Sequence, residues 1–475
     1  MISGSDILAN NAVFAVVSQA AQGQETDAYL IGGFVRDAIL GRPVPQDIDF
    51  VTTGNGIALA KAVANLLPGQ PQVQVFKNFG TAMFRYGGID YEFVGARKES
   101  YSPNSRKPEV MGGTLEDDQN RRDFTINALA VSLNANDYGR LLDPFNGLAD
   151  MEAKIIRTPL DPDTTFSDDP LRMMRAIRFA NQLDFTIHPE ALKAIERNRL
   201  RIHIISRERI SVELNKIMAC AKPSVGFRLL METKLLHEFF PQLVELIGVD
   251  EIEGQTHKDN FYHTLQVVDN ISAKSDNIWL RWAALLHDIG KPKSKRFDEK
   301  NGWTFHGHEF LGAKMIPTIF KQLRLPLNDR LKYVQKLVRM SSRPTALTNN
   351  AVTDSAVRRL LFEAGDDIDD LMQLCEADIT TKNKDRQKRY LRNYRRVREK
   401  LIEIEEKDHI RNMQPPISGE YIMRHFQLQP GPVVGKLKES IKEAILEGEI
   451  PNEFDAAHEY MLKIAANLGL TIKTE

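Results

Sequence analysis

The chain of 475 residues is longer than one hydrophobic core usually supports, so we expect three or four domains. Its 42% hydrophobic and 27% charged residues are ordinary for a globular protein; a net charge of −1 argues against a uniformly basic nucleic-acid-binding surface, although 63 Lys and Arg leave room for a local basic track. Two distant cysteines, no signal-peptide pattern and no apolar run near the ~18 residues of a membrane span predict a soluble cytoplasmic protein whose cysteines serve packing.

The predicted secondary structure changes character near residue 159. Before it, short β-like runs such as YLIGG, DIDFV and TAMFRY alternate with helical stretches such as GIALAKAVANLL. Beyond it, long helical periodicity begins with DDPLRMMRAIRFANQLDF. We therefore expect an α/β domain followed by an almost wholly helical remainder, with domains at residues 1–157, 158–250, 251–380 and 381–475. No internal repeat is evident, which disfavours a solenoid.

The first motif combines two glycines with two carboxylates. Gly32 and Gly33 end an apolar run and open a helix that carries Arg36, and Asp47 and Asp49 follow on a predicted strand. Because strand side chains alternate between faces, the two carboxylates point the same way and repel each other unless a divalent cation lies between them. Paired Mg²⁺ ions are the usual arrangement for phosphoryl transfer, and glycines let backbone N–H groups approach a phosphate. The motif predicts a metal and phosphate site, although D-x-D at a solvated strand end also occurs by chance.

A second motif, RRDFTINALAV, occupies residues 121–131 and changes from polar to an apolar helix or strand. Its plain interpretation is a charged element start over a core segment. Arg122 is also a fixed cation and Asp123 an acceptor, and together they suit a triphosphate and a ribose hydroxyl.

A third motif, DDPLRMMRAIRFA, occupies residues 168–180. On a helix, Asp169 and Arg172 are i,i+3 neighbours, and Arg175 and Arg178 continue the stripe, which by itself indicates only an intrahelical ion pair beside a basic face. An Asp acceptor beside an Arg donor also matches the Watson–Crick edges of cytosine and adenine and leaves guanine and uracil with unpaired groups. The motif therefore predicts that the protein itself selects the nucleotide.

Histidines and aspartates with metal-ligand character gather in residues 254–380. The candidate ligands are His263, His287, Asp288, His306, His308 and Asp378. A lone His on an apolar helix is more often a packed core residue than a ligand, but the adjacent His-Asp pair within LLHDIGKP is less ordinary.

A basic run extends from Lys382 to Lys400. It can be a solvated helix face whose positive charge is balanced by the acidic residues just beyond it. Tyr390 and Tyr394 would then be the packing stripe of this helix. It can equally be a phosphate track for an RNA, whose binding would weaken with salt. The sequence leaves both interpretations open.

Five motifs together resemble the class II nucleotidyltransferases, which comprise bacterial-type CCA-adding tRNA nucleotidyltransferases and their poly(A) polymerase relatives. They are GGFVRD with DID, RRDFTINA, DPFNG at residues 143–147, DDPLRMMRAIRFA and RERISVELNKI, in family order over residues 30–215. The resemblance implies an α+β fold: an N-terminal nucleotidyltransferase palm with a short mixed β-sheet, an all-α neck, an HD-type helical domain and a helical tail that binds tRNA.

The resemblance also implies a role for each motif residue. Asp47 and Asp49 would bind the catalytic metals, and Gly32, Gly33 and Arg36 would meet the triphosphate. Arg122 and Asp123 would hold ribose and triphosphate, and Asp169 and Arg172 would pair with the base, with Arg175 and Arg178 nearby. DPFNG would be the hinge between palm and neck. Asp168 departs from the family, which often has Glu there, and Arg97 and Tyr101 fall in a stretch that resembles its flexible loop.

HTLQVV and LLHDIGKP resemble the HD hydrolase superfamily, in which a His, a His-Asp pair and a distant Asp bind a metal. This carries over to His263, His287, Asp288 and Asp378. HGHEFLGA resembles the extra histidine segment of some members, which adds His308 for a second ion, with His306 as the weaker candidate.

The expected reaction is template-independent transfer of CMP and AMP from CTP and ATP to the 3′ end of tRNA, with Mg²⁺ at the palm and release of pyrophosphate. The HD site would hold a divalent transition metal or Mg²⁺. Three alternatives stay open: a poly(A) polymerase or an enzyme that adds only part of CCA, a metal-dependent HD phosphohydrolase as the main activity, and a non-catalytic RNA-binding scaffold. The sequence does not indicate an oligomeric state.

Overall fold

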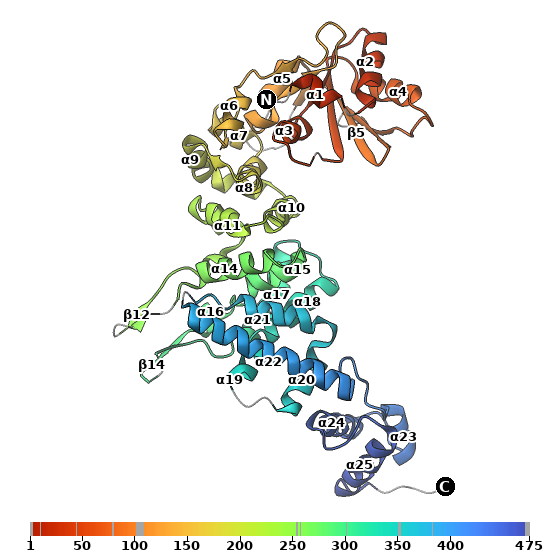
Figure 1. Cartoon of the computed structure of the whole chain (residues 1–475), viewed down its shortest axis with the longest axis vertical. Helices are drawn as coiled ribbons and strands as arrows, with labels where there is room; N and C mark the ends of the chain where they lie inside the picture. Colours follow the sequence, from red (N-terminus) through yellow and green to blue (C-terminus); the bar gives the residue numbers. More distant parts are fainter. Residues whose placement is uncertain are drawn as a thin grey trace. The chain divides into compact units, whose positions relative to one another are not determined.

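The computed structural model describes residues 3–9, 11–43, 45–77, 80–100, 109–252, 255–256, 258–300, 302–349, 353–381 and 383–470. Tyr101 and Lys382, named above, lie outside these ranges. The chain forms two compact units, residues 1–220 with 225–241 and residues 221–224 with 242–475 (Figure 1). The finer division into four domains remains a prediction. None of the helices in the described ranges is long and apolar enough to cross a membrane.

The first unit is built on a seven-stranded mixed sheet. Its strands, in spatial order, are β3 (Gln74–Phe76), β4 (Thr81–Tyr86), β5 (Ile89–Gly95), β2 (Asp47–Thr52), β1 (Ala28–Ile31), β8 (Ala130–Ser132) and β9 (Leu141–Leu142). Only β2 and β5 pair in parallel; the other neighbours are antiparallel. The strands predicted from YLIGG, DIDFV and TAMFRY are confirmed as β1, β2 and β4.

The two faces of this sheet differ in character. On one face, Phe50, Phe84 and Phe93 stack on one another and are fully buried. The helices α2 (Val13–Gly23) and α4 (Gly56–Leu66) add Phe14 and other apolar side chains to this core. Because side chains alternate, Asp47 and Asp49 stand on the opposite face, while Ile48 is 1% exposed on the core side. The expected direction of the carboxylate pair is confirmed.

The remaining elements of the first unit are short helices and small ribbons around and beyond the sheet. They are α1 (Gly4–Leu8), α3 (Gly33–Ile39), α5 (Leu115–Asn120), η2 (Thr125–Asn127), α6 (Gly147–Glu152), α7 (Pro162–Asp168), α8 (Leu171–Leu183), α9 (Pro189–Asn198), η3 (Arg199–Ile204), α10 (Arg207–Met218), α11 (Pro223–Glu232) and α12 (Leu235–Phe239), with the pairs β6 (Arg97–Ser100)–β7 (Glu109–Gly112) and β10 (Ile155–Ile156)–β11 (Thr186–Ile187). Between α11 and the second unit, α13 covers Pro241–Val244.

The second unit is almost wholly helical. Its helices are α14 (Asn260–Ser272), α15 (Ile278–Leu286), α16 (Lys291–Ser294), α17 (His308–Gln322), α18 (Asp329–Met340), α19 (Arg343–Asn349), α20 (Asp354–Ala364), η4 (Gly365–Asp367), α21 (Ile368–Ala377), α22 (Lys384–Asp408), α23 (Gly419–Phe426), α24 (Pro432–Glu447) and α25 (Phe454–Asn467). Two small ribbons, β12 (Glu251–Ile252)–β13 (Gln255–Thr256) and β14 (Arg296–Asp298)–β15 (Gly302–Thr304), complete it. The α+β architecture expected from the sequence is confirmed.

The helix α22 is the longest element of the second unit and packs on α19, α20 and α21 (Figure 1). Asn383 caps its start by accepting a hydrogen bond from the N–H of Arg386. Tyr394, Val397, Leu401 and Ile404 form its buried stripe. Tyr394 is thus a packing residue as expected, whereas Tyr390 is only half-buried. The two cysteines, Cys220 and Cys375, are buried free thiols, which agrees with the predicted packing role.

Candidate active site

The glycine turn places three functional groups side by side. Gly32 follows β1 with φ +87°, and a Cβ built there would lie 3.1 Å from Nη1 of Arg122 and 3.4 Å from Oδ2 of Asp49. A glycine is required because of the backbone conformation and because a side chain would displace those two groups. The predicted metal and phosphate motifs, which are far apart in the sequence, therefore meet at one point of the first unit.

A third carboxylate joins the pair from the neighbouring strand. In the parallel register, Glu92 of β5 lies opposite Asp49 of β2. Burial raises the pKa of Glu92, and Asp49 and Asp47 raise it further against the opposing effect of Arg97. Burial also raises the pKa of Asp49, opposed by Arg122 and reinforced by Asp47. Carboxylates on neighbouring strands of one sheet face supply the oxygen ligands that Mg²⁺ prefers, and burial outweighs the nearby arginines in raising the pKa of both Asp49 and Glu92. Glu92 was missed from the sequence, where only alternation in DYEFV and strand pairing could have revealed it.

Arg36 is buried and fully engaged rather than turned toward open space. Its Nε and Nη2 donate to both carboxylate oxygens of Asp37, at 2.9 and 2.7 Å, and Nη1 donates to Oδ1 of Asn127 at 2.7 Å. Its guanidinium also lies 4.9 Å from the ring centre of Phe179. In this arrangement Arg36 organises the loop beneath the site, and the predicted contact with a triphosphate remains a prediction.

The RRD motif separates its two arginines from its aspartate. Arg121 and Arg122 both bond to Asp118, which is fully buried in α5, with Arg122 Nε 3.2 Å from Oδ2. Asp123 instead accepts from Nε of Arg175 at 2.7 Å and from Nδ2 of Asn127 at 2.9 Å. The structure thus brings Arg122 to the carboxylate face and ties Asp123 to α8.

The prediction that Asp169 lies on the same helix as Arg172 is wrong. Asp169 is extended, with φ −129° and ψ 98°, and separates α7 from α8, because a residue that precedes proline is disfavoured in the helical region. Its Oδ1 accepts from the N–H of Leu171 at 3.1 Å, which caps α8. The guanidinium of Arg172 donates to the backbone carbonyls of Arg121 and Thr165 instead of pairing with Asp169.

The RERISVELNKI motif supplies the partners of this segment from α10. Nη2 of Arg209 lies 3.5 Å from Oδ2 of Asp169, and the buried Glu213 lies 2.8 Å from Nε of Arg178. Arg178 is therefore an internal ion-pair partner in this structure, while the side chain of Arg175 is 34% exposed. Arg209 and Glu213 were missed as individual residues, although the motif that contains them was recognised.

The DPFNG segment forms a tight start to α6. Oδ1 and Oδ2 of Asp143 accept from the N–H groups of Gly147 and Leu148 at 2.6 and 3.0 Å, and Asn146 is left-handed with φ 58°. A Cβ on Gly147 would lie 2.6 Å from the carbonyl oxygen of Thr125, so only glycine fits. Its role as a hinge remains a prediction.

The histidines and aspartates of the second unit converge from four helices. His263 lies on α14, His287 and Asp288 follow α15, His308 opens α17 and Asp378 ends α21. Ligand atoms of His263, His287 and Asp378 all lie within 4.8 Å of one another. Asp288 Oδ2 is 3.3 Å from Nε2 of His287, and Asp288 Oδ1 is 3.5 Å from Nε2 of His308. The predicted cluster is assembled, while His306 makes no contact with it in the described part of the chain.

The hydrogen bonds fix these imidazoles in the form that a metal needs. Nδ1 of His287 donates to the carbonyl of Ala284 at 2.7 Å, and Nδ1 of His308 donates to that of Phe305 at 2.8 Å. In the neutral ring each Nε2 then carries the lone pair, so a bound metal would take the place of the proton that His287 otherwise holds there. Nε2 of His287 is buried without a hydrogen-bond partner, as a metal ligand would be. Although burial opposes it, the pKa of His287 rises to about 10 because Asp288 and Asp378 flank it, which shows how strongly this pocket favours a cation. The donors fit a divalent metal.

Adjacent strands that bear carboxylates beside a glycine turn and a fixed arginine define a nucleotidyltransferase head domain, joined here to a His–Asp metal centre. Residues 28–157 match the Poly A polymerase head domain, residues 184–246 the "Probable RNA and SrmB- binding site of polymerase A" and residues 260–382 the HD domain. The chain belongs to the nucleotidyltransferase family of CCA-adding enzymes and poly(A) polymerases, as its relatives show.

Two curated relatives and one solved structure illustrate this similarity. The Multifunctional CCA protein of Shewanella frigidimarina is 34% identical over 313 residues, 63% of this chain and 70% of the relative. The A-adding tRNA nucleotidyltransferase of Deinococcus radiodurans is 29% identical over 438 residues, 89% of this chain and 92% of the relative. A tRNA nucleotidyltransferase crystallised with a primer tRNA and an incoming ATP analog aligns with TM-score 0.57 and 25% identity, over 81% of this chain and 98% of that one.

Proposed function

We propose that this chain completes the 3′ end of tRNA by transferring CMP and AMP from CTP and ATP, without a nucleic-acid template. The observation that carries the proposal is that Asp49 and Arg122 meet at Gly32. A Cβ built on Gly32 would lie 3.1 Å from the guanidinium of Arg122 and 3.4 Å from the carboxylate of Asp49. Relatives named for CCA addition and for A addition to tRNA support this substrate class.

The chain's own groups divide the work of transfer. Asp47, Asp49 and Glu92 would hold Mg²⁺, which when bound makes the attacking ribose hydroxyl more acidic and neutralises charge on the α-phosphate. Arg122, fixed by Asp118, would present a cation to the triphosphate beside Gly32, which has no side chain to separate them. The tRNA 3′ oxygen bonds to the α-phosphorus, the bond to the β-phosphate oxygen breaks, and pyrophosphate leaves.

Base choice would rest on Asp169 and Arg172 at the start of α8. The carboxylate of Asp169 would accept a hydrogen bond from the exocyclic amino group that cytosine and adenine share. Arg172 would donate a hydrogen bond to the ring nitrogen beside it. Arg209 and the N–H of Leu171 hold Asp169 in place. In the observed conformation Arg172 donates to backbone carbonyls, so nucleotide binding would redirect its guanidinium.

The test uses the full chain with Mg²⁺, labelled CTP or ATP, and tRNA that lacks none, one or all of its CCA nucleotides. Two C followed by one A, lost in Asp47→Ala, is the expected result. Addition of A alone would match the A-adding relative instead, and long A tracts would indicate a poly(A) polymerase. No incorporation, with phosphoester hydrolysis that is lost in Asp288→Ala, would make the HD centre the main activity.

A second function is favoured by the His–Asp centre, whose ligand atoms lie within 4.8 Å of one another. We propose that it hydrolyses a phosphate ester with a divalent transition metal, because imidazole-rich donor sets suit such ions. Water would bond to phosphorus, the ester P–O bond would break, and the leaving oxygen would take a proton. His287→Ala should lose bound metal, measured by elemental analysis, and hydrolysis together, whereas His306→Ala, outside the cluster, should keep both. Hydrolysis that survives His287→Ala would refute this role.

A further inference from the structure

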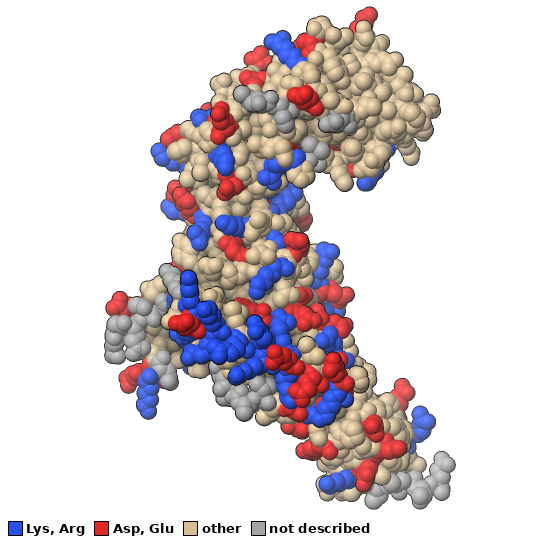
Figure 2. Space-filling view, viewed as in Figure 1, with Lys and Arg blue, Asp and Glu red and all other residues tan. Residues whose placement is uncertain are grey.

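The helix α22 concentrates its basic residues in its first half. Residues 384–396 contain seven Lys or Arg and one Asp, whereas residues 397–408 contain five Asp or Glu and three Lys or Arg. Figure 2 shows the basic residues gathered over the first half of this helix and the acidic ones over the second. The helix dipole acts on the first and last turns, where α22 has Asp385 and Lys407, so it does not account for the basic residues further along the first half.

The basic residues of the two halves also differ in their partners. Arg398 lies 2.7 Å from Glu376, and Lys400 lies 3.0 Å from Asp354, so these two cations hold α22 on its neighbours. Four arginines of the first half are exposed and form no ion pair with any carboxylate in the described ranges. They are Arg386, Arg389, Arg392 and Arg396. Their charge is available to a partner.

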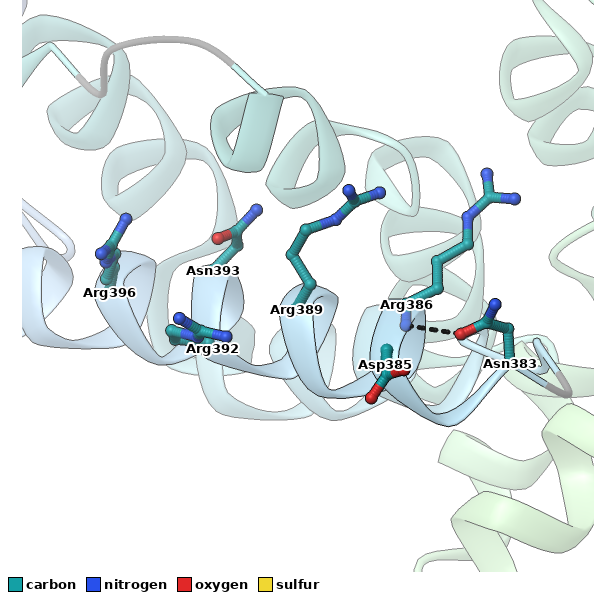
Figure 3. A pocket seen from close by; sticks show the side chains of 7 residues that line it. All are labelled: Asn383, Asp385, Arg386, Arg389, Arg392, Asn393 and Arg396. Carbon is teal, nitrogen blue, oxygen red and sulfur yellow. Dashed lines mark hydrogen bonds between the residues drawn. The ribbon is translucent and has the colours of Figure 1, made fainter.

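These four arginines line one groove of about 680 Å³. Figure 3 shows Arg386, Arg389 and Arg396 leaving the same side of α22, with Asn393 between them. From Arg386 to Arg396 the helix rises ~15 Å, a length over which successive phosphates of one strand can be contacted. Guanidinium groups at this spacing suit a row of phosphates.

An aromatic ring beside two of the groove arginines favours RNA over other polyanions. The guanidinium groups of Arg386 and Arg389 lie 5.5 and 5.6 Å from the ring centre of Tyr390. Tyr390 is half-buried and borders a second cavity of about 340 Å³. A tyrosine flanked by arginines is a platform on which a base can stack, which an acidic peptide would not use.

The second cavity shares one lining residue with the groove and one with the metal centre. Arg386 lines both, and the second cavity is also lined by Lys258, Thr380 and Asp378. Asp378 also lies 2.8 Å from Nε2 of His263, so one wall of the cavity is a member of the His–Asp cluster. Basic residues thus continue from the groove to the candidate site of hydrolysis.

We propose that α22 binds a single RNA strand along Arg386, Arg389, Arg392 and Arg396 and delivers its phosphorylated end to the His–Asp centre. This site is separate from the nucleotidyl-transfer site of the first unit. The delivery step rests on the proposed hydrolytic function of that centre; the binding step does not.

The binding test measures the affinity of the full chain for a fluorescent 12-nucleotide RNA with a 3′-phosphate, by anisotropy over a salt series. Arg389→Glu/Arg396→Glu reverses two groove charges. Lys388→Glu/Arg395→Glu, on exposed positions of α22 that do not line the groove, changes the net charge equally. The variant Arg389→Glu/Arg396→Glu, the groove pair, should weaken RNA binding at least tenfold. The variant Lys388→Glu/Arg395→Glu, the control pair, should weaken it less than threefold. Removing two phosphate contacts should reduce the salt slope by about 1.4.

The melting temperatures of both pairs should stay close to that of the wild type, because all four substituted positions are exposed. Equal losses from both pairs, or displacement of the RNA by polyglutamate of the same charge as effectively as by RNA, would overturn the proposal.

The delivery test compares two substrates of the His–Asp centre. The groove pair should raise KM for release of phosphate from the RNA at least tenfold more than KM for p-nitrophenyl phosphate. His287→Ala should abolish hydrolysis while keeping the RNA affinity, which separates failure of the hydrolytic function from failure of the groove. A larger effect of the groove pair on nucleotide addition to tRNA than on hydrolysis would refute delivery to this centre.

Discussion

Oδ2 of Asp123 lies 2.7 Å from Nε and 2.6 Å from Nη2 of Arg175, which joins the loop after α5 to the middle of α8. The other oxygen of Asp123 accepts from the N–H of Phe124 and from Asn127, both at 2.9 Å. Every favourable acceptor direction of this buried carboxylate is therefore used. The link fixes the distance between the residues that would face the triphosphate and the helix that would read the base.

This ion pair predicts a stability that depends on acidity. Burial opposes ionisation, but Arg175 and Asn127 hold the pKa of Asp123 at about 2, below the usual 3.8. Because the folded pKa is the lower one, the stabilisation is complete above pH 4 and is lost as the pH falls from about 4 to 2. Asp123→Asn should cost about 2 kcal/mol at pH 7 and much less at pH 2. Amide hydrogen exchange in α8 measures the difference.

The exposed pair of Asp163 and Arg197 provides the control, since both side chains are about half exposed. Asp163→Asn should cost less than ~1 kcal/mol at pH 7 because solvent screens such pairs. Equal costs for the two variants would contradict a special role for Asp123.

Gly32→Ala should reduce kcat/KM for CTP and ATP by about 10²-fold at an unchanged folded fraction, because the new methyl group would shift Arg122 and Asp49. Gly41→Ala is the matched control: Gly41 also has a positive φ, +62°, but its Cβ would meet nothing within 4 Å. Both variants should lose stability through backbone strain. Only the first should lose transfer, and similar transfer rates in both would reject the assignment.

Glu92→Gln should lower kcat by roughly 10²-fold and raise the Mg²⁺ concentration needed for half-maximal transfer, because a neutral amide holds a cation less well. Asp137→Asn removes a charge elsewhere in the first unit, from a carboxylate that lies 3.9 Å from the exposed Arg140. It should leave the Mg²⁺ requirement close to that of the wild type. A Mg²⁺ titration of each variant decides whether Glu92 belongs to the metal site.

Arg209→Ala should relax base choice by about tenfold, with CTP and ATP losing their advantage over UTP and GTP, because Asp169 would lose the cation that orients it. Arg207→Ala on the same helix removes a guanidinium that contacts only a backbone carbonyl, that of Glu238, among the bonds described. Competition of CTP with UTP, and of ATP with GTP, in one reaction measures the selectivity ratio directly. Unchanged selectivity in Arg209→Ala would show that α10 does not position Asp169 for base recognition.

Local patterns predicted much of the fold. Alternation in DIDFV identified β2 and the common direction of Asp47 and Asp49, and the apolar periodicity around residue 171 identified α8. Pairing between strands could not be predicted in this way, because the parallel register of β2 with β5 depends on the chain between them. Glu92 was missed for that reason.

The candidate sites also combine features that the sequence could predict with features that depend on packing. His287 and Asp288 are neighbours in the sequence, and the resemblance to the HD superfamily placed His263, His308 and Asp378 with them, whereas His306 lies outside the cluster. The tautomers could not be predicted, because they depend on the carbonyls of Ala284 and Phe305. For Asp169, helical periodicity outweighed the effect of Pro170 on the preceding residue, and the placement was wrong. The partner of Asp169, Arg209, arises from packing of α10 on α8, which a one-dimensional pattern does not contain.

The parallel pairing of β2 with β5 also governs when activity can arise during synthesis of the chain. Asp49 leaves the ribosome well before Glu92, and Arg209 and Glu213 follow much later, so on the proposed function a nascent chain would hold the metal-binding carboxylates before it holds the groups that would position Asp169 and Arg178. Contacts so distant in sequence form slowly, after long loops have closed. A partly made chain would therefore lack discrimination between nucleotides until α10 has emerged and docked, and premature termination before residue 213 would yield a fragment without nucleotide selectivity.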